Sequence, residues 1–106
     1  MQIGNIMSPK IHIDIDKIAI FCRKWKITEF AVFGSVLRED FRPDSDVDVL
    51  VSFERNAGWS LVDIVEMKDE LELVLGREVD LVEKGAVRNP FRRHAIMTNR
   101  EVLYAA

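Results

Sequence analysis

The sequence has few of the features that stabilise a small secreted protein or anchor a chain in a membrane. Cys22 is the one cysteine in 106 residues, which excludes an intramolecular disulfide and a zinc site built on several cysteines. No apolar run reaches the roughly 20 residues that span a bilayer, and residues 1–10 lack the layout of a signal peptide. These absences predict a cytoplasmic protein with no membrane contact.

An excess of one charge is also lacking, since the formal net charge is −3. We therefore expect no direct nucleic-acid binding. The two signs are unevenly placed, because residues 63–72 are mostly acidic and the charged residues within 84–100 are all basic. Such runs are usually solvated helix faces, and the alternative is a basic edge that faces a nucleotide or an acidic partner.

The length predicts a single domain over residues 1–106, of which 1–12 form a loose N-terminal segment. Apolar spacing and turn residues predict helices and strands in alternation, and hence an α/β or α+β fold with helices packed against a sheet. The expected helices cover residues 15–25, 60–75 and 90–97, with a helical turn at 35–38, and the expected strands cover 29–33, 46–53, 78–82 and 101–104.

Capping residues set the ends of two of these helices. Asp14 is the expected N-cap of the first helix, and Ser60 and Gly76 are the expected start and stop of the long one. Cys22 and Trp25 fall on the apolar stripe of the first helix, so we expect both in the core. The apolar face expected for the long helix consists of Leu61, Ile64, Val65, Leu71, Val74 and Leu75.

Asp46 and Asp48 are separated by one residue within a predicted strand, so both side chains point to the same face. Two adjacent carboxylates repel each other, and a hard cation such as Mg²⁺ between them removes that cost. Taken alone, this pair is more often the solvated face of an ordinary strand. Asp80 offers a third carboxylate from another strand, and three such groups suit two metal ions and proton transfer from an attacking hydroxyl.

Gly34 and Ser35 directly follow the first predicted strand. Glycine permits a tight turn and close approach of a ligand, and the Ser35 hydroxyl with nearby N–H groups suits phosphate oxygens. The chain then returns through Asp44 and Ser45 to the aspartate strand. This order places phosphate donors and metal ligands together.

Residues 33–38 (FGSVLR), 42–51 (RPDSDVDVLV) and 76–82 (GREVDLV) resemble the signature of the minimal nucleotidyltransferases, a family of the DNA polymerase β-like superfamily. The likeness runs from about Ile15 to Tyr104. It implies a mixed β-sheet of about four strands flanked by helices. It also implies ATP as substrate and Mg²⁺, with two ions, as cofactor.

The resemblance further implies a role for each matching residue. Asp46, Asp48 and Asp80 are the expected catalytic and metal-binding residues. The expected nucleotide-binding residues are Gly34, Ser35, Arg38, Asp44 and Ser45. Many family members have glycine after the arginine, where this chain has Glu39, and an inward-pointing acid there weakens nucleotide binding.

Small members of the family often act as antitoxins beside a HEPN-type ribonuclease toxin. The resemblance therefore implies transfer of AMP from ATP to a protein hydroxyl, a tyrosine of such a toxin, within a type VII-like toxin–antitoxin pair. The alternative is a non-catalytic antitoxin of the same fold that neutralises its partner by binding alone. Transfer to a small molecule such as an aminoglycoside is disfavoured, because this chain has no room for a second substrate-binding domain.

Overall fold

The computed structural model describes residues 11–39, 41–42 and 44–106. The expectation of a loose N-terminal segment falls almost entirely on residues 1–10, outside that part. The elements follow one another as α1 (Ile15–Lys24), β1 (Ile27–Phe33), the short 3₁₀ helix η1 (Gly34–Leu37), β2 (Val47–Phe53), α2 (Leu61–Leu75), β3 (Val79–Glu83), the 3₁₀ turn η2 (Lys84–Ala86), α3 (Pro90–Thr98) and β4 (Arg100–Ala105). Every predicted helix and strand is present, with bounds that differ by one or two residues.

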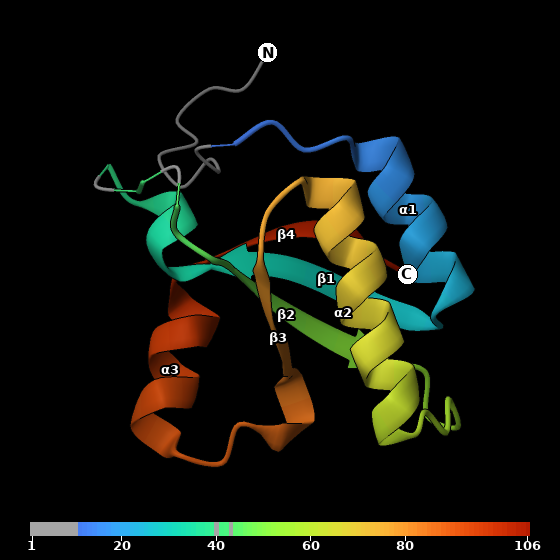
Figure 1. Cartoon of the computed structure of the whole chain (residues 1–106). Coiled ribbons are helices and arrows are strands. Elements are labelled where there is room, and N and C mark those ends of the chain that lie inside the picture. The colour runs from blue at the N-terminus through green and yellow to red at the C-terminus, as the bar shows by residue number, and fades with distance from the viewer. Residues whose placement is uncertain (1–10, 40, 43) are drawn as a thin grey trace.

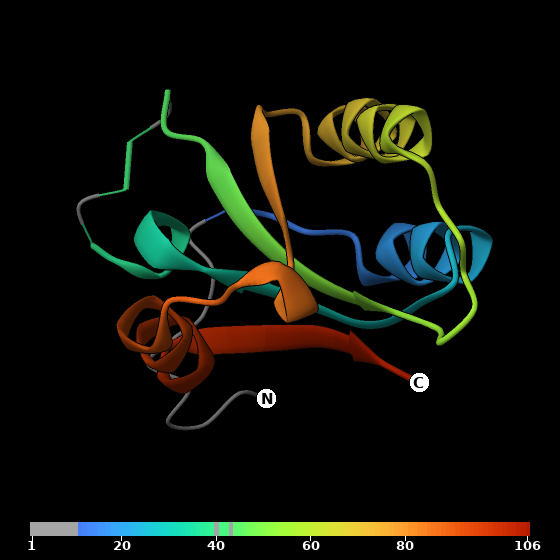
Figure 2. The ribbon, with the colours of Figure 1, turned by 90° about the horizontal axis from the view of Figure 1, so that it is seen from below.

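The four strands form one mixed sheet in the order β3-β2-β1-β4. Strand β1 pairs antiparallel with β2 and β4, whereas β2 pairs parallel with β3. Helices α1 and α2 cover one face of the sheet, and α3 lies against the other (Figures 1 and 2). The predicted mixed α+β architecture is confirmed.

Alternation along the strands divides the buried side chains between the two faces. Phe30, Val32, Val49 and Val51 pack toward α1 and α2, in a cluster that includes Cys22 and Trp25 as predicted. The opposite face has a smaller cluster under α3, made of Ala31, Phe33, Leu50, Val87 and Ile96. Burial raises the pKa of the Cys22 thiol to about 12, so the thiol stays protonated.

The predicted caps are also confirmed. The Asp14 side chain accepts hydrogen bonds from the first turn of α1. Ser60 and Asp63 form a reciprocal capping box at the start of α2, and Gly76 ends that helix with φ +69°. No helix in the described ranges is long and apolar enough to cross a membrane.

The face that α2 turns to the core was predicted incorrectly in part. Leu71 is buried, and Ile64, Val74 and Leu75 pack against the core as expected. Leu61 and Val65 are instead exposed, and Met67 is fully buried. Apolar residues occur all around α2, so their spacing alone does not orient the helix, and the position of the sheet below it selects the Met67–Leu71 stripe.

Two leucines of α2 provide a matched test of this orientation. Leu71 is 0% exposed and Leu73 is 85% exposed. We expect Leu71→Ala to lower the free energy of unfolding by about 2–5 kcal/mol, because it leaves a cavity. Leu73→Ala should change it by less than about 0.5 kcal/mol. Urea denaturation of both variants measures the difference, and equal losses would show that the helix is rotated from the position described.

Candidate active site

Three acidic side chains gather where β2 begins. Asp48 in β2 lies directly opposite Asp80 in the parallel register with β3, and such neighbouring strands are about 4.8 Å apart. Asp46 immediately precedes β2, which begins at Val47, one residue later than predicted. The three aspartates that the sequence singled out are therefore neighbours, and Asp48 lies on the sheet face that α3 partly covers.

The surroundings of Asp48 shift the pKa of its carboxyl group. Burial raises the pKa of its carboxyl group, and the charges of Asp80 and then Asp46 raise the pKa further. The guanidinium groups of Arg92 and Arg38 act in the opposite direction and lower it. The ionised form of this carboxyl is thus disfavoured by its surroundings, and added positive charge at the site would stabilise it.

The donor set fits a divalent cation in its chemistry, because carboxylate oxygens are the ligands that Mg²⁺ prefers. Within residues 11–39, 41–42 and 44–106, no three His, Cys, Asp or Glu side chains are already arranged as a complete metal site. Magnesium commonly binds through one or two carboxylates together with phosphate oxygens of the substrate. The carboxylates therefore suit an ion whose remaining ligands come from the substrate.

Gly34 connects these carboxylates to the end of β1. Phe33 lies opposite Asp48 in the antiparallel register, so the next residue turns over the aspartate. Gly34 has φ +75°, and a Cβ atom on it would lie inside van der Waals contact of Asp48 Oδ2. The backbone conformation therefore favours glycine at this position, and a Cβ atom here would also force the Asp48 carboxylate to move.

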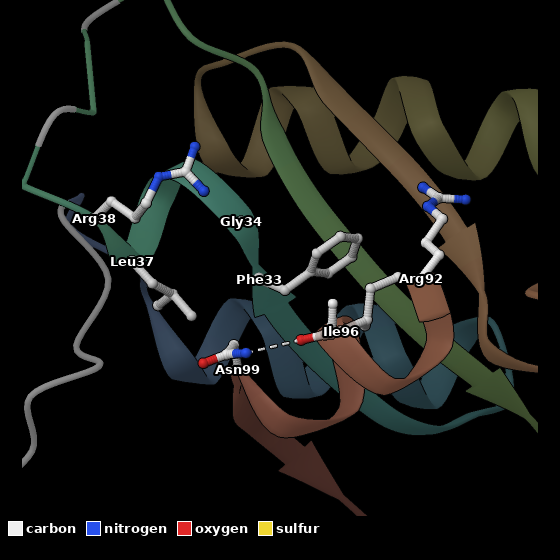
Figure 3. Close-up of a pocket in the computed structure, with 8 residues that line it drawn as sticks. Phe33, Gly34, Leu37, Arg38, Arg92, Ile96 and Asn99 are labelled. Carbon is white, nitrogen blue, oxygen red and sulfur yellow. Dashed lines mark hydrogen bonds between the residues drawn. The ribbon is translucent and has the colours of Figure 1, made fainter. Parts of the chain in front are cut away.

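The predicted nucleotide-binding residues divide between two hollows. Gly34 and Arg38 line a pocket of about 340 Å³ between η1 and α3 (Figure 3). Asp44, Ser45 and Asp46 line a second hollow of about 240 Å³ with the residues just after α2. Ser35 is half-buried within η1 and lines neither, and Glu39 is exposed after η1 and also lines neither.

The loop before β2 has its own supports. The Ser45 hydroxyl accepts a hydrogen bond from the Arg42 N–H at 3.3 Å, which tightens the turn. Arg77 donates to the Arg42 carbonyl at 3.2 Å and lies 4.7 Å from the Phe41 ring centre. Arg77 was not singled out by sequence reasoning, because its partners lie more than 30 residues away along the chain.

Arg92 of α3 is a second site residue that sequence reasoning did not single out. It lines the 340 Å³ pocket, and its charge acts on Asp48. The basic run 84–100 contained it, but nothing in the run distinguished Arg92 from Arg93. In the structure Arg93 donates to the Lys84 carbonyl at 2.8 Å. Lys84 and Arg100 both pair with Glu29, at 3.3 and 3.2 Å.

The close approach of Gly34 to Asp48 predicts a difference between two glycines. Gly76 has φ +69° with open space around it, so Gly76→Ala should cost only the left-handed backbone, about 1–2 kcal/mol. Gly34→Ala should cost a further 1–3 kcal/mol or so through overpacking. Urea denaturation measures both, and Gly34→Ala combined with Asp48→Ala should recover the extra part. Equal costs for the two glycines would contradict the close approach.

The raised pKa of Asp48 predicts a pH dependence of stability. The folded chain holds a proton on Asp48 at pH values where the unfolded chain has lost it, so the free energy of unfolding falls as pH rises through the raised pKa. Asp48→Asn cannot ionise, so it should have a higher free energy of unfolding than the wild type at neutral pH. This difference in free energy should vanish below the ordinary aspartate range, about pH 3, where Asp48 is protonated in both states. Denaturation curves of both proteins from acidic to neutral pH check this, and a pH-independent gain would contradict it.

Comparison with known proteins agrees with this geometry. The sequence profile of the family described as "Nucleotidyltransferase domain" matches residues 16–103. A relative from Thermococcus cleftensis, named protein adenylyltransferase MntA, is 38% identical over 81 residues, covering 76% of this chain and 77% of the relative.

Solved structures share the fold. A toxin–antitoxin structure with AMP-PNP matches with a TM-score of 0.71 at 21% identity, over 89% of this chain and 75% of that one. A complex of tri-AMPylated Shewanella oneidensis HEPN toxin with MNT antitoxin matches with a TM-score of 0.63 at 21% identity, over 87% and 70%. The resemblance first seen in residues 33–51 and 76–82 is thus confirmed, and the chain belongs to the nucleotidyltransferase domain family and is a nucleotidyltransferase.

Proposed function

We propose that this chain transfers AMP from ATP to a hydroxyl group of a partner protein. The observation that carries the proposal is the row formed by Asp48 and Asp80 on adjacent strands, with Gly34 folded over Asp48. The pocket that Gly34 lines adjoins the Asp48 carboxylate, where added positive charge is favoured, and we infer that the phosphate chain lies there. The adenylyltransferase relative supports the choice of AMP.

In the proposed reaction the acceptor oxygen attacks the α-phosphorus of ATP. The bond from that phosphorus to the bridging oxygen breaks, and pyrophosphate leaves with the electron pair. Asp80 is exposed on the edge strand β3, so its carboxylate can meet a macromolecular acceptor and take the hydroxyl proton. Gly34, Ser35 and Arg38 hold the triphosphate, and Arg92 adds positive charge near the carboxylates.

Asp46, Asp48 and Asp80 would also bind Mg²⁺, with two ions in the full site. Bound there, the ions supply charge neutralisation for the phosphates and lower the pKa of the attacking hydroxyl. Asp48 is next to both of the other aspartates, since Asp80 lies opposite it on β3 and Asp46 precedes it by two residues. Asp44 and Ser45 orient this end of β2 through the tight turn that Ser45 closes.

The proposed partner is a HEPN-type toxin, and the proposed acceptor is a tyrosine of that toxin, so that the chain acts as a cytoplasmic antitoxin. Support comes from structures of the same fold solved as toxin–antitoxin complexes, one of them with an AMPylated HEPN toxin. A HEPN-type protein encoded beside this chain's gene is the partner to test.

The decisive experiment uses ATP labelled at the α-phosphate, Mg²⁺ and that neighbouring protein. Asp46→Asn with Asp48→Asn should lower labelling by at least about a hundredfold, because the site loses its charge for binding metal and phosphate. Asp69→Asn on the exposed side of α2 removes the same kind of charge away from the site and should leave labelling unchanged. Mass spectrometry of the labelled protein identifies the modified residue.

Undiminished labelling by the double variant would contradict the proposal. If that variant labels nothing and yet neutralises the partner fully in cells, the chain acts as an antitoxin by binding alone.

A further inference from the structure

The pocket between η1 and α3 has two chemically different parts. Phe33 and Leu37 line the wall on the β1–η1 side (Figure 3), and Ala95 and Ile96 line the wall on the α3 side. These walls are apolar, and the volume of about 340 Å³ is at the lower end of small-molecule sites. Arg38 and Arg92 supply the charged part of the lining. The pocket therefore suits a ligand with a flat apolar body and an anionic end.

The charged part of the pocket adjoins the carboxylate site. Gly34 lines the pocket and also lies against the Asp48 carboxylate. Arg38 and Arg92 line the same pocket as Gly34. A triphosphate held at Gly34 would thus extend directly into the pocket with whatever is attached to its α-phosphate.

Asn99 gives the pocket a polar group of fixed orientation. Its amide Nδ2 donates to the Ala95 carbonyl and to Thr98 Oγ1, both at 3.1 Å. The Thr98 hydroxyl donates its own proton to the His94 carbonyl at 2.8 Å, so it can only accept from Asn99. Figure 3 shows the amide nitrogen turned toward the helix and the oxygen turned away from it. Asn99, which lines the pocket, therefore keeps its Oδ1 as the atom that can accept a hydrogen bond from a ligand.

We propose that this pocket binds the base and ribose of the nucleotide, and that Asn99 Oδ1 selects a purine with an amino group at C6, as in adenine. This inference rests on the proposed nucleotidyl transfer and adds the part of the site that reads the base. An amino group donates to Oδ1, whereas a 6-oxo purine places a second acceptor there and leaves both oxygens unpaired.

ATP and purine riboside triphosphate test the role of Asn99, because their bases differ only by the 6-amino group, and N1 is unprotonated in both. We expect the wild-type chain, with Mg²⁺, to bind ATP about threefold to tenfold more tightly than purine riboside triphosphate, the range for one hydrogen bond. Asn99→Leu should bring the ratio of the two dissociation constants close to one. The ratio is insensitive to a general loss of affinity, so it separates base selection from structural damage. An unchanged ratio in the variant would overturn the role of Asn99.

A second pair of variants tests the pocket itself. Ala95→Phe places a ring in the pocket, and His94→Phe places the same ring at the neighbouring exposed position of α3. We expect Ala95→Phe to weaken ATP binding at least tenfold and to leave binding of inorganic tripolyphosphate, which has no nucleoside, unchanged. His94→Phe should leave both unchanged.

If Ala95→Phe lowers AMP transfer with no change in ATP affinity, the pocket holds the acceptor side chain and the inference is wrong. The proposed transfer would then still stand, provided that it depends on Asp46 and Asp48. Failure of the wild-type chain to bind ATP at all would remove both proposals.

Discussion

The fold and the carboxylate site both depend on how strand β2 is paired, antiparallel with β1 on one side and parallel with β3 on the other. Its antiparallel register with β1 places Asp48 beside Phe33, and its parallel register with β3 places Asp48 beside Asp80. A shift of one residue in either register would turn the aspartates toward the hydrophobic core. The parallel pair also requires a long crossover connection, which α2 provides. The geometry of the site and the helical layer therefore follow from the same two registers.

The residues of the carboxylate site lower the stability of the folded chain. Asp48 is partly buried near two like charges, and Gly34 occupies a backbone conformation that other residues adopt only with strain. Arg38 and Arg92 offset part of the repulsion. Val47, Val49 and Val51 point to the opposite face of β2 from Asp48 and are buried in the main cluster. The same short strand therefore contributes side chains to the hydrophobic core and to the carboxylate site.

Patterns with a local cause could be predicted from the sequence. Helix caps such as Asp14 and Ser60 act within a few residues, and the two-residue period of a strand puts Asp46 and Asp48 together. The orientation of α2 was not predictable in full, because its apolar residues surround the helix. Arg77 and Arg92 were missed as site residues for a related reason, since each is defined by contacts with residues distant in sequence. Proximity of that kind arises only from the tertiary fold.

The position of β3 at the edge of the sheet has a consequence for association between chains. An edge strand exposes unpaired backbone groups to any other extended segment, and short length and charged side chains discourage such pairing. Strand β3 has five residues, and two of its exposed side chains are the carboxylates of Asp80 and Glu83. The charge of Asp80, which we propose to serve nucleotidyl transfer, thus also disfavours edge-to-edge aggregation of the sheet.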